Sequence, residues 1–368
     1  MALNNIYKYK KAIFFFSRKQ LTLLLIVMLL SIIGMIFILT ENKLNKNILE
    51  NTDSELIEKK NKEENNTNMI KYNDELQFKD TNVLCPENFV AIPGGFDVDG
   101  NGINESWFCV MKYEAKKGKN NEPISIPEKR PWVSISQNEA REKCQSLGKG
   151  YSLITNKQWI QIAKIAAHVD ENWISGKVGN GSLIRGHSDK NPYKTLEAST
   201  DDNDGFYKTG TNADDSQKRT FIIKNGVLGY DSNFSSNYQG VVWDIAGNIW
   251  EWNNDTIDCS AGYPCINMPQ PSNSQNYELN EFTESGKYFK TFELIRPNSY
   301  WNSTENIGRV YSAGNKPVPE GNQHGLARGG IWYDENDAGL FTAYFGIAPS
   351  FSKYTIGFRC TYVPNFES

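Results

Sequence analysis

The most varied side chains of the chain gather near its C-terminus, between residues 327 and 360. Blocks of small or apolar residues alternate there with clusters of chemically unrelated side chains, one around Tyr333, one around Tyr344 and one around Phe351. The aromatic rings sit among turn residues and not in an apolar period. Large aromatic side chains on a rigid surface are typical of binding faces. The pattern therefore predicts a ligand-binding surface, and the alternative is that these rings are ordinary core.

The segment Asp244–Trp252 is the second candidate for chemistry. Its sequence, DIAGNIWEW, places the side-chain oxygens of Asn248 and Glu251 beside a glycine turn. Oxygen ligands suit a hard cation, so these two residues are a candidate Ca²⁺ site. The alternative is a tightly turned core segment whose side chains bond to the backbone. We expect no other cofactor.

Two further motifs favour structural roles. Residues 97–102, DVDGNG, match the first half of a calcium-binding loop, but the twelfth position is Phe108, where a bidentate glutamate is needed. We therefore expect a glycine-rich hairpin turn. The three histidines, His168, His187 and His324, lie far apart in the sequence without metal-ligand spacing, and no nucleophile motif accompanies them. They are expected to be hydrogen-bonded structural residues.

Charge and cysteine content limit the class of protein. The 368 residues carry a net charge of −4, which leaves no broad basic field, so we expect no nucleic-acid partner. All six cysteines lie beyond residue 84 and none forms a C-x-x-C pair, which argues against a zinc site. An even number in an external domain favours disulfides, whereas a reducing cytosol would leave free thiols. The sequence alone does not choose the pairing.

The N-terminal region predicts a membrane anchor. Residues 21–39 are uncharged and long enough to span a bilayer as a helix. The basic segment 1–20 precedes them, which predicts a cytoplasmic N-terminus and an extracellular C-terminal part. A cleaved signal peptide or a prepilin leader is the alternative, but the residues expected at either cleavage site are missing. We expect a single-pass protein of the cell membrane.

The rest of the chain divides into a stalk and a folded domain. Residues 40–83 are dominated by Asn, Lys, Glu and Asp, so we expect a flexible stalk. Residues 84–363 contain two capping boxes, at Ser136 and at Thr155, each of which predicts the start of a helix. Short apolar segments such as Phe89–Pro93, set among glycine and polar residues, predict strands. The fold class is therefore α+β with much irregular structure.

Four ordered landmarks give this domain a resemblance to a known family. Leu153–Trp159, Asp244–Trp252, Arg328–Trp332 and Gly357–Cys360 resemble landmarks of formylglycine-generating-enzyme-type domains. The resemblance covers most of residues 85–363. It implies a loop-rich C-type lectin fold of that type, preceded here by the predicted transmembrane helix.

The resemblance does not extend to the catalytic residues. Catalytic members carry a pair of copper-binding cysteines shortly after the Arg-Gly-Gly block, but residues 331–349 contain no cysteine. Nothing nearby replaces the thiolates. We therefore expect a protein that is not an enzyme, and a divergent oxidase is one alternative. An envelope or pilin-like structural subunit, assembled through the N-terminal helix, is the other.

Residues 328–360 also resemble the variable region of proteins diversified by diversity-generating retroelements. The shared framework is R-G-G-x-W, A-G-x-F, A-P-S and I-G-F-R-C. In such proteins the lectin fold displays the altered residues to a ligand, which here is expected to be a protein at the cell surface. Glu335 and Lys353 depart from the pattern, because a randomised AAC codon yields neither. By position, the ligand-binding set comprises Ile331, Trp332, Tyr333, Asp334, Glu335, Asp337, Tyr344, Phe345, Gly346, Ile347, Phe351, Lys353 and Tyr354, in which Trp332 is a framework residue among the variable ones.

The same resemblance implies a disulfide framework. The family fold ties its first helix to the C-terminal strand, which implies a Cys144–Cys360 bond. Two further pairings are hypotheses: Cys259–Cys265 would close a short loop, and Cys85–Cys109 would close a hairpin.

Overall fold

The computed structural model describes residues 84–188, 198–200, 202, 205, 217–258, 276–277, 301, 303–312 and 323–364. The chain divides into two compact units, residues 1–72 and 73–368, and all of the described residues belong to the second. The predicted basic segment, membrane anchor and stalk lie outside the described residues. Among the helices that are described, none has the length and apolar character needed to cross a bilayer.

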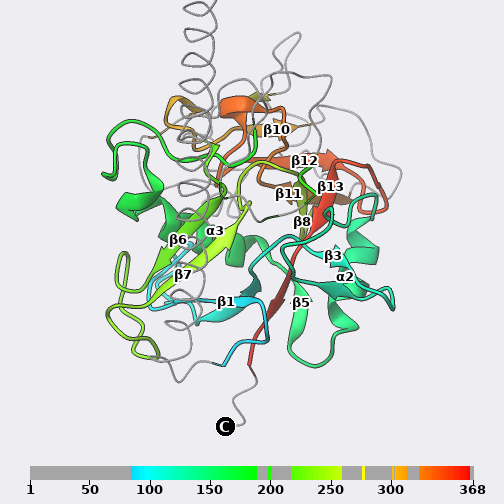
Figure 1. The fold of residues 1–368 in the computed structure, drawn as a ribbon, viewed down its shortest axis with the longest axis horizontal. Helices are drawn as coiled ribbons and strands as arrows, with labels where there is room; N and C mark the ends of the chain where they lie inside the picture. The colour runs from blue at the N-terminus through cyan, green and yellow to red at the C-terminus, as the bar shows by residue number, and fades with distance from the viewer. Residues whose placement is uncertain are drawn as a thin grey trace, which may run out of the picture. The chain divides into compact units, whose positions relative to one another are not determined.

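Two sheets form the framework of the domain (Figure 1). The four-stranded sheet has the order β1 (Phe89–Ile92), β2 (Phe108–Met111), β14 (Cys360–Tyr362) and β5 (Tyr151–Leu153). The six-stranded sheet has the order β13 (Ile356–Phe358), β8 (Trp250–Asp258), β11 (Gln323–Arg328), β12 (Ala343–Ile347), β10 (Val310–Ser312) and β9 (Asn276–Tyr277). Two short pairs complete the described strands, β3 (Lys116–Lys117) with β4 (Pro123–Ile124), and β6 (Thr220–Lys224) with β7 (Gln239–Trp243). The predicted α+β class is confirmed.

The helices begin where the capping boxes predict. α2 (Gln137–Gln145) and α3 (Asn156–Ala167) each start after a hydroxyl residue, Ser136 or Thr155, that accepts the backbone N–H three residues later. The side chain at that later position accepts the N–H of the capping residue in return, so two otherwise unpaired donors are satisfied in each helix. Short 3-10 helices follow elsewhere: η1 (Asp170–Asn172), η5 (Ser303–Glu305) and η6 (Glu335–Asp337).

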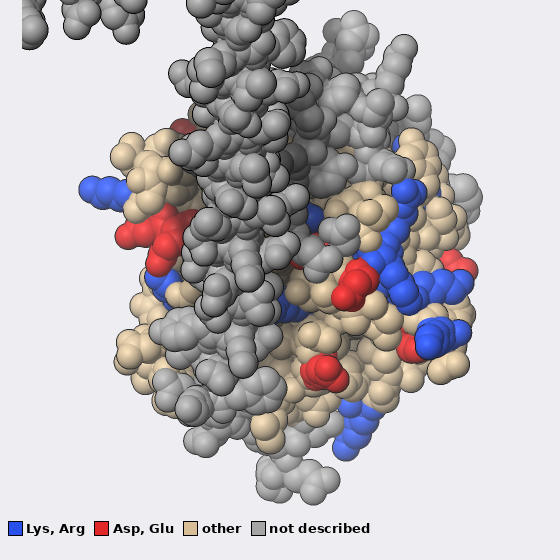
Figure 2. Space-filling view, viewed as in Figure 1, with Lys and Arg blue, Asp and Glu red and all other residues tan. Residues whose placement is uncertain are grey.

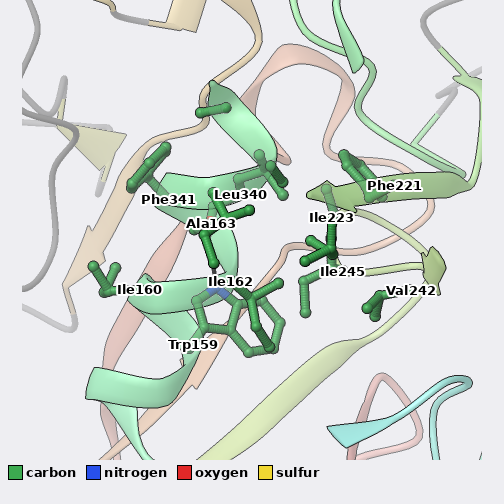
Figure 3. Close-up of a cluster of buried hydrophobic side chains, with 14 of the residues drawn as sticks. Trp159, Ile160, Ile162, Ala163, Phe221, Ile223, Val242, Ile245, Leu340 and Phe341 are labelled. Carbon is green, nitrogen blue, oxygen red and sulfur yellow. Dashed lines mark hydrogen bonds between the residues drawn. The ribbon is translucent and has the colours of Figure 1, made fainter. Parts of the chain in front are cut away.

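The larger core cluster surrounds α3. Trp159, Ile162 and Ala163 of this helix are buried against side chains from β6, β7 and the segment before β12, as Figure 3 shows. The indole N–H of Trp159 donates to the carbonyl oxygen of Leu340 at 2.8 Å, so the ring fixes the depth at which α3 lies. A second cluster lies among β1, β2, α2, β8 and β13 and includes Trp252 and Phe358. These two cores hold the sheets that carry the C-terminal segment.

Two predicted disulfides are confirmed. Cys144 on α2 is bonded to Cys360 on β14, with Cα atoms 5.4 Å apart. Cys85 is bonded to Cys109 on β2, with Cα atoms 5.7 Å apart. The first closes a sequence separation of 216 residues, which strongly restricts the unfolded chain. The third hypothetical pair, Cys259 with Cys265, lies outside the described residues.

Candidate ligand-binding surface

Two glycine-containing loops interlock next to the C-terminal segment. We call residues 185–188 and 244–248 the glycine hub. Gly186 has φ +65°, and a Cβ on it would overlap the carbonyl oxygen of Ala246. Gly247 has φ +76°, and a Cβ there would overlap a carbonyl oxygen of the facing loop. The backbones meet so closely that only glycine fits at both positions.

The glycine hub holds residues 331–337, the first turn of the predicted surface. The N–H of Trp332 donates to the carbonyl oxygen of Asn248 at 3.2 Å, and the N–H of Glu335 donates to that of Ser188 at 2.8 Å. The N–H of Gly247 donates to the carbonyl oxygen of Gly329 at 3.0 Å. Both hub loops therefore bond to the backbone around this turn, which restricts its motion.

A buried ion pair fixes β8 beside the hub. The side chains of Glu251 and Arg359 are both 0% exposed. The Arg359 guanidinium donates Nε to one Glu251 carboxylate oxygen at 2.6 Å and Nη2 to the other, and Nη1 donates to the carbonyl oxygen of Met111 at 3.1 Å. This two-pronged geometry satisfies both carboxylate oxygens inside the protein.

Asn248 is also bonded on both sides of its amide. Its Oδ1 accepts the N–H of Ser199 at 2.9 Å and lies 3.3 Å from Nδ1 of His187, while Nδ2 donates to the Glu114 carboxyl group. The oxygens of Asn248 and Glu251 that were candidate Ca²⁺ ligands thus have protein partners. Most of these partners are side chains, and Arg359 places a positive charge next to the Glu251 carboxylate.

The other two motifs also have structural contacts. The carboxylate of Asp97 accepts four backbone N–H groups, from residues 99 to 102, at 2.6–3.2 Å, which makes the expected turn. Lys157 of α3 lies 3.1 Å from Asp99 and also pairs with Glu105. His168 Nδ1 lies 2.8 Å from the carbonyl oxygen of Lys164. No group of three metal-binding side chains occurs among the described residues.

Glu114 is a buried carboxyl group whose pKa is strongly raised. Its side chain is buried, and burial together with the negative charges of Asp244 and Glu251 raises the pKa of its carboxyl group well above the ordinary value of 4.5. The charged groups that act on it are Asp244, Glu251, Lys116 and Asp202. Folded Glu114 therefore retains its proton to a higher pH than a solvent-exposed glutamate does.

The raised pKa of Glu114 predicts that the stability of the domain depends on pH. Above about pH 4.5 the unfolded chain loses the proton that folded Glu114 retains, so the free energy of unfolding falls as pH rises, by up to about 1.4 kcal/mol per pH unit from this group. Glu114→Gln is expected to remove that part of the slope. Urea unfolding from pH 5 to 8 measures it, with Glu87→Gln, at an exposed position, as control. Equal slopes in all three proteins would show that Glu114 ionises normally.

The predicted ligand-binding residues fall into three groups by burial. Ile331, Trp332 and Ile347 are buried, with 3%, 5% and 6% exposure. Tyr333, Asp334, Glu335, Asp337 and Tyr344 are half-buried. Phe351, Lys353 and Tyr354 are exposed, the two rings by 40% and 61%. The backbone of Phe345 and Gly346 belongs to β12.

The expected exposure is therefore wrong for three positions. Ile331, Trp332 and Ile347 belong to the second core cluster, together with Trp250. Ile347 lies on an interior strand of the six-stranded sheet, where one face of each strand meets the core. A ligand would therefore contact the half-buried neighbours of these three side chains and not the three side chains themselves.

Two of the acidic side chains hold the first turn. Oδ2 of Asp334 accepts the N–H of Ile331 at 3.0 Å. Oδ1 of Asp337 lies 3.2 Å from Nε of Arg309 in an ion pair that is partly exposed. Glu335 adopts a left-handed conformation, with φ +49°. Asp334 and Asp337 thus stabilise the turn in addition to any charge they offer a ligand.

An aromatic platform includes two residues that the sequence did not single out as ligand-binding. Tyr311 of β10 lies beside Tyr344 of β12 in a parallel pair, and their ring centroids are 6.3 Å apart. Trp250 packs on both rings, at 5.3 Å and 5.6 Å. Burial, reinforced by the charges of Asp334 and Asp337, raises the pKa of Tyr311. No local sequence pattern indicates that β10 pairs with β12, so the contact between Tyr311 and Tyr344 could not be predicted from the sequence.

The second turn, residues 349–355, is attached to the scaffold at several points. The N–H of Ser134 donates to the carbonyl oxygen of Lys353, that of Gln137 to Pro349 and that of Trp250 to Thr355, each at 3.0 Å. These bonds come from the start of α2 and from β8. Between them the side chains of residues 350–354 face solvent. Nζ of Lys353 lies 5.9 Å from the centre of the Tyr354 ring.

Residues 55–363 match the model of the sulfatase-modifying factor enzyme 1-like domain. The chain belongs to this family. The domain accordingly has the formylglycine-generating-enzyme type of C-type lectin-like fold, α+β and loop-rich. The match begins at residue 55, within the segment predicted to be a stalk. No curated protein matches the sequence.

Solved structures show low similarity to this sulfatase-modifying factor enzyme 1-like domain. The Major Tropism Determinant I1 variant is 13% identical with a TM-score of 0.33, over 77% of this chain and 55% of its own. Treponema denticola variable protein 1 is 13% identical with a TM-score of 0.32, over 75% and 95%. CarF is 13% identical with a TM-score of 0.33, over 76% and 99%. This chain thus spans about half the length of the first.

Proposed function

We propose that this protein is a non-catalytic, cell-surface ligand-binding protein whose C-terminal segment is diversified by a retroelement to vary its partner. The observation that carries the proposal is the turn 349–355. Backbone bonds from separate elements restrict it, yet it presents Phe351, Lys353 and Tyr354 to solvent. Rigid aromatic side chains supply contact area at a low cost in conformational entropy.

The turn lies apart from the first described residues of the domain. β13 starts directly after the turn, and β14 continues toward the C-terminus, as Figure 1 shows. At the far end of this run Tyr362 pairs with Cys109, which is bonded to Cys85, near the start of the folded part. The binding turn and the start of the domain therefore lie at opposite ends of the β13–β14 run.

The proposed location is the cell membrane, with residues 21–39 as a single-pass anchor and the domain outside. The two disulfides support an oxidising compartment. The proposed partner is a surface protein and not a nucleic acid. On the face drawn in Figure 2, basic and acidic side chains are interspersed over the described surface, which offers no continuous basic field there.

Binding by the turn is tested by removing its rings. The full chain in mild detergent is applied to an array of cell-surface proteins, and the strongest partner is kept. Phe351→Ala and Tyr354→Ala are each expected to weaken binding to that partner by about tenfold or more. Unfolding temperatures should stay close to the parent's, because both rings are well exposed.

The matched control is Tyr230→Ala, which removes another exposed ring, 59% exposed, outside the C-terminal segment. It should leave the affinity unchanged. If the three variants bind equally well, the turn does not carry recognition. If Phe351→Ala and Tyr354→Ala unfold the domain, the rings are structural and the proposal fails.

A further inference from the structure

A buried pair of opposite charges lies in the interior, next to the ion pair of Arg219 with Asp244. Nζ of Lys116, on β3, lies 2.8 Å from Oδ2 of Asp202, and their side chains are 0% and 1% exposed. Apart from this mutual contact, neither of these two atoms has a hydrogen-bond partner. Asp202 is held in place by its own N–H, which donates to the carbonyl oxygen of Pro127 at 2.7 Å.

This arrangement does not suit an ammonium group. A lysine ammonium has three N–H donors, and here at most one of them meets an acceptor, Asp202. Each donor left unpaired in a dry interior costs about 1–3 kcal/mol. A buried ion pair is stable only when further hydrogen bonds satisfy its remaining donors and acceptors. An amide nitrogen in the same place would carry one N–H and no charge. Joining the two side chains would therefore remove the unmet hydrogen-bonding demand and both buried charges.

We propose that Nζ of Lys116 and Cγ of Asp202 are joined by an isopeptide bond that forms after folding. A proton first passes from Nζ to Oδ2 across their contact, which leaves a neutral amine and a neutral acid. The nitrogen then attacks Cγ. Oδ2 leaves as water and takes a second proton from the nitrogen. One ammonium and one carboxylate thus become one amide and one water, and no oxidant or other reactant is needed.

Arg219 is placed to assist this reaction. Its Nη2 donates to the other oxygen of Asp202, Oδ1, and also to Asp244. Oδ1 would carry the negative charge of the tetrahedral intermediate, and a fixed guanidinium stabilises such a charge. Burial and the charge of Asp244 raise the pKa of the Asp202 carboxyl, which brings its neutral form within reach.

Proximity supplies the remaining driving force. Amide formation from an amine and an acid is unfavourable in dilute water, but well-oriented intramolecular groups reach effective concentrations of about 10⁵–10⁸ M. The site is shielded from solvent, so little water is available to hydrolyse the amide once it has formed. The product would tie β3 covalently to Asp202.

The test is mass spectrometry of the full chain, reduced, alkylated and digested with trypsin. We expect a branched peptide that contains Lys116 and Asp202 and weighs one water less than the two linear peptides together. Fragmentation should place the branch at these two residues. Recovery of both linear peptides in full yield, without the branched species, would overturn the proposal.

Variants show whether the mass deficit of one water comes from this bond or from another dehydration of the chain. Lys116→Met should restore the full mass, whereas Lys224→Met, which removes a partly exposed lysine paired with Glu171, should keep the deficit. A deficit that persists in Lys116→Met and maps to an Asp-Gly sequence such as Asp99-Gly100 would be a succinimide and would also overturn the proposal. Because the parent protein alone gives a decisive answer, the test stands even if Lys116→Met does not fold.

Discussion

Glu251→Ala is expected to lower the free energy of unfolding by about 3–5 kcal/mol, because it leaves the guanidinium of Arg359 buried without its counter-charge. Both side chains are fully buried, and Arg359 donates two hydrogen bonds to Glu251, from Nε and from Nη2. Its remaining bonds go to carbonyl oxygens, including those of Met111 and Trp243, which cannot neutralise it. Chemical denaturation monitored by tryptophan fluorescence measures the loss.

The control for this change is Glu87→Ala, at an exposed position. It should alter the unfolding free energy by less than about 0.5 kcal/mol. Glu251→Gln should fall between the two, because it keeps one carbonyl acceptor but loses the charge. Equal stability of Glu251→Ala and Glu87→Ala would mean that the ion pair does not hold β8 to the C-terminal strands.

Gly186→Ala should destabilise the domain by about 2–6 kcal/mol, the sum of two separate costs. A left-handed backbone costs a residue with a Cβ about 1–3 kcal/mol, and forcing an atom into a filled space costs about 1–3 kcal/mol more. Gly186 has φ +65°, and its added Cβ would overlap the carbonyl oxygen of Ala246. Because that oxygen is backbone, relief requires the two loops of the glycine hub to separate.

Gly176→Ala isolates the first of these costs. Gly176 has a similar φ of +71°, but a Cβ there would meet nothing within 4 Å. Thermal unfolding of both variants gives the comparison, and the Gly186 variant should be clearly the less stable. If the two lose the same stability, the hub loops tolerate separation, and the rigidity attributed to the turn above them is not supported.

Local sequence patterns predicted the local structure well. The capping boxes at Ser136 and Thr155 placed the starts of α2 and α3 because they report contacts within four residues. The strand at Phe89 was predicted from a short apolar segment bounded by polar residues. The ordered landmarks, although far apart, predicted the family and two disulfides, because a shared fold brings the same residues together.

Long-range contacts account for what the sequence did not reveal. The partner of Glu251 lies 108 residues farther along the chain, so nothing near the DIAGNIWEW segment distinguished an ion pair from a cation site. Tyr311 joins the aromatic platform through a parallel strand pair, which no local pattern predicts. Ile331 and Ile347 matched the variable pattern by position, but position in a motif does not determine whether a side chain packs into the core.

Sequencing the gene for residues 328–360 from many independent isolates that carry this protein tests the central claim most directly. The account predicts that amino-acid differences gather at the exposed and half-buried positions, such as Tyr333, Tyr344, Phe351 and Tyr354. The framework blocks that form the core and the ion pair should remain constant. Differences spread evenly over surface and core, or confined to the framework, would contradict a diversified binding surface.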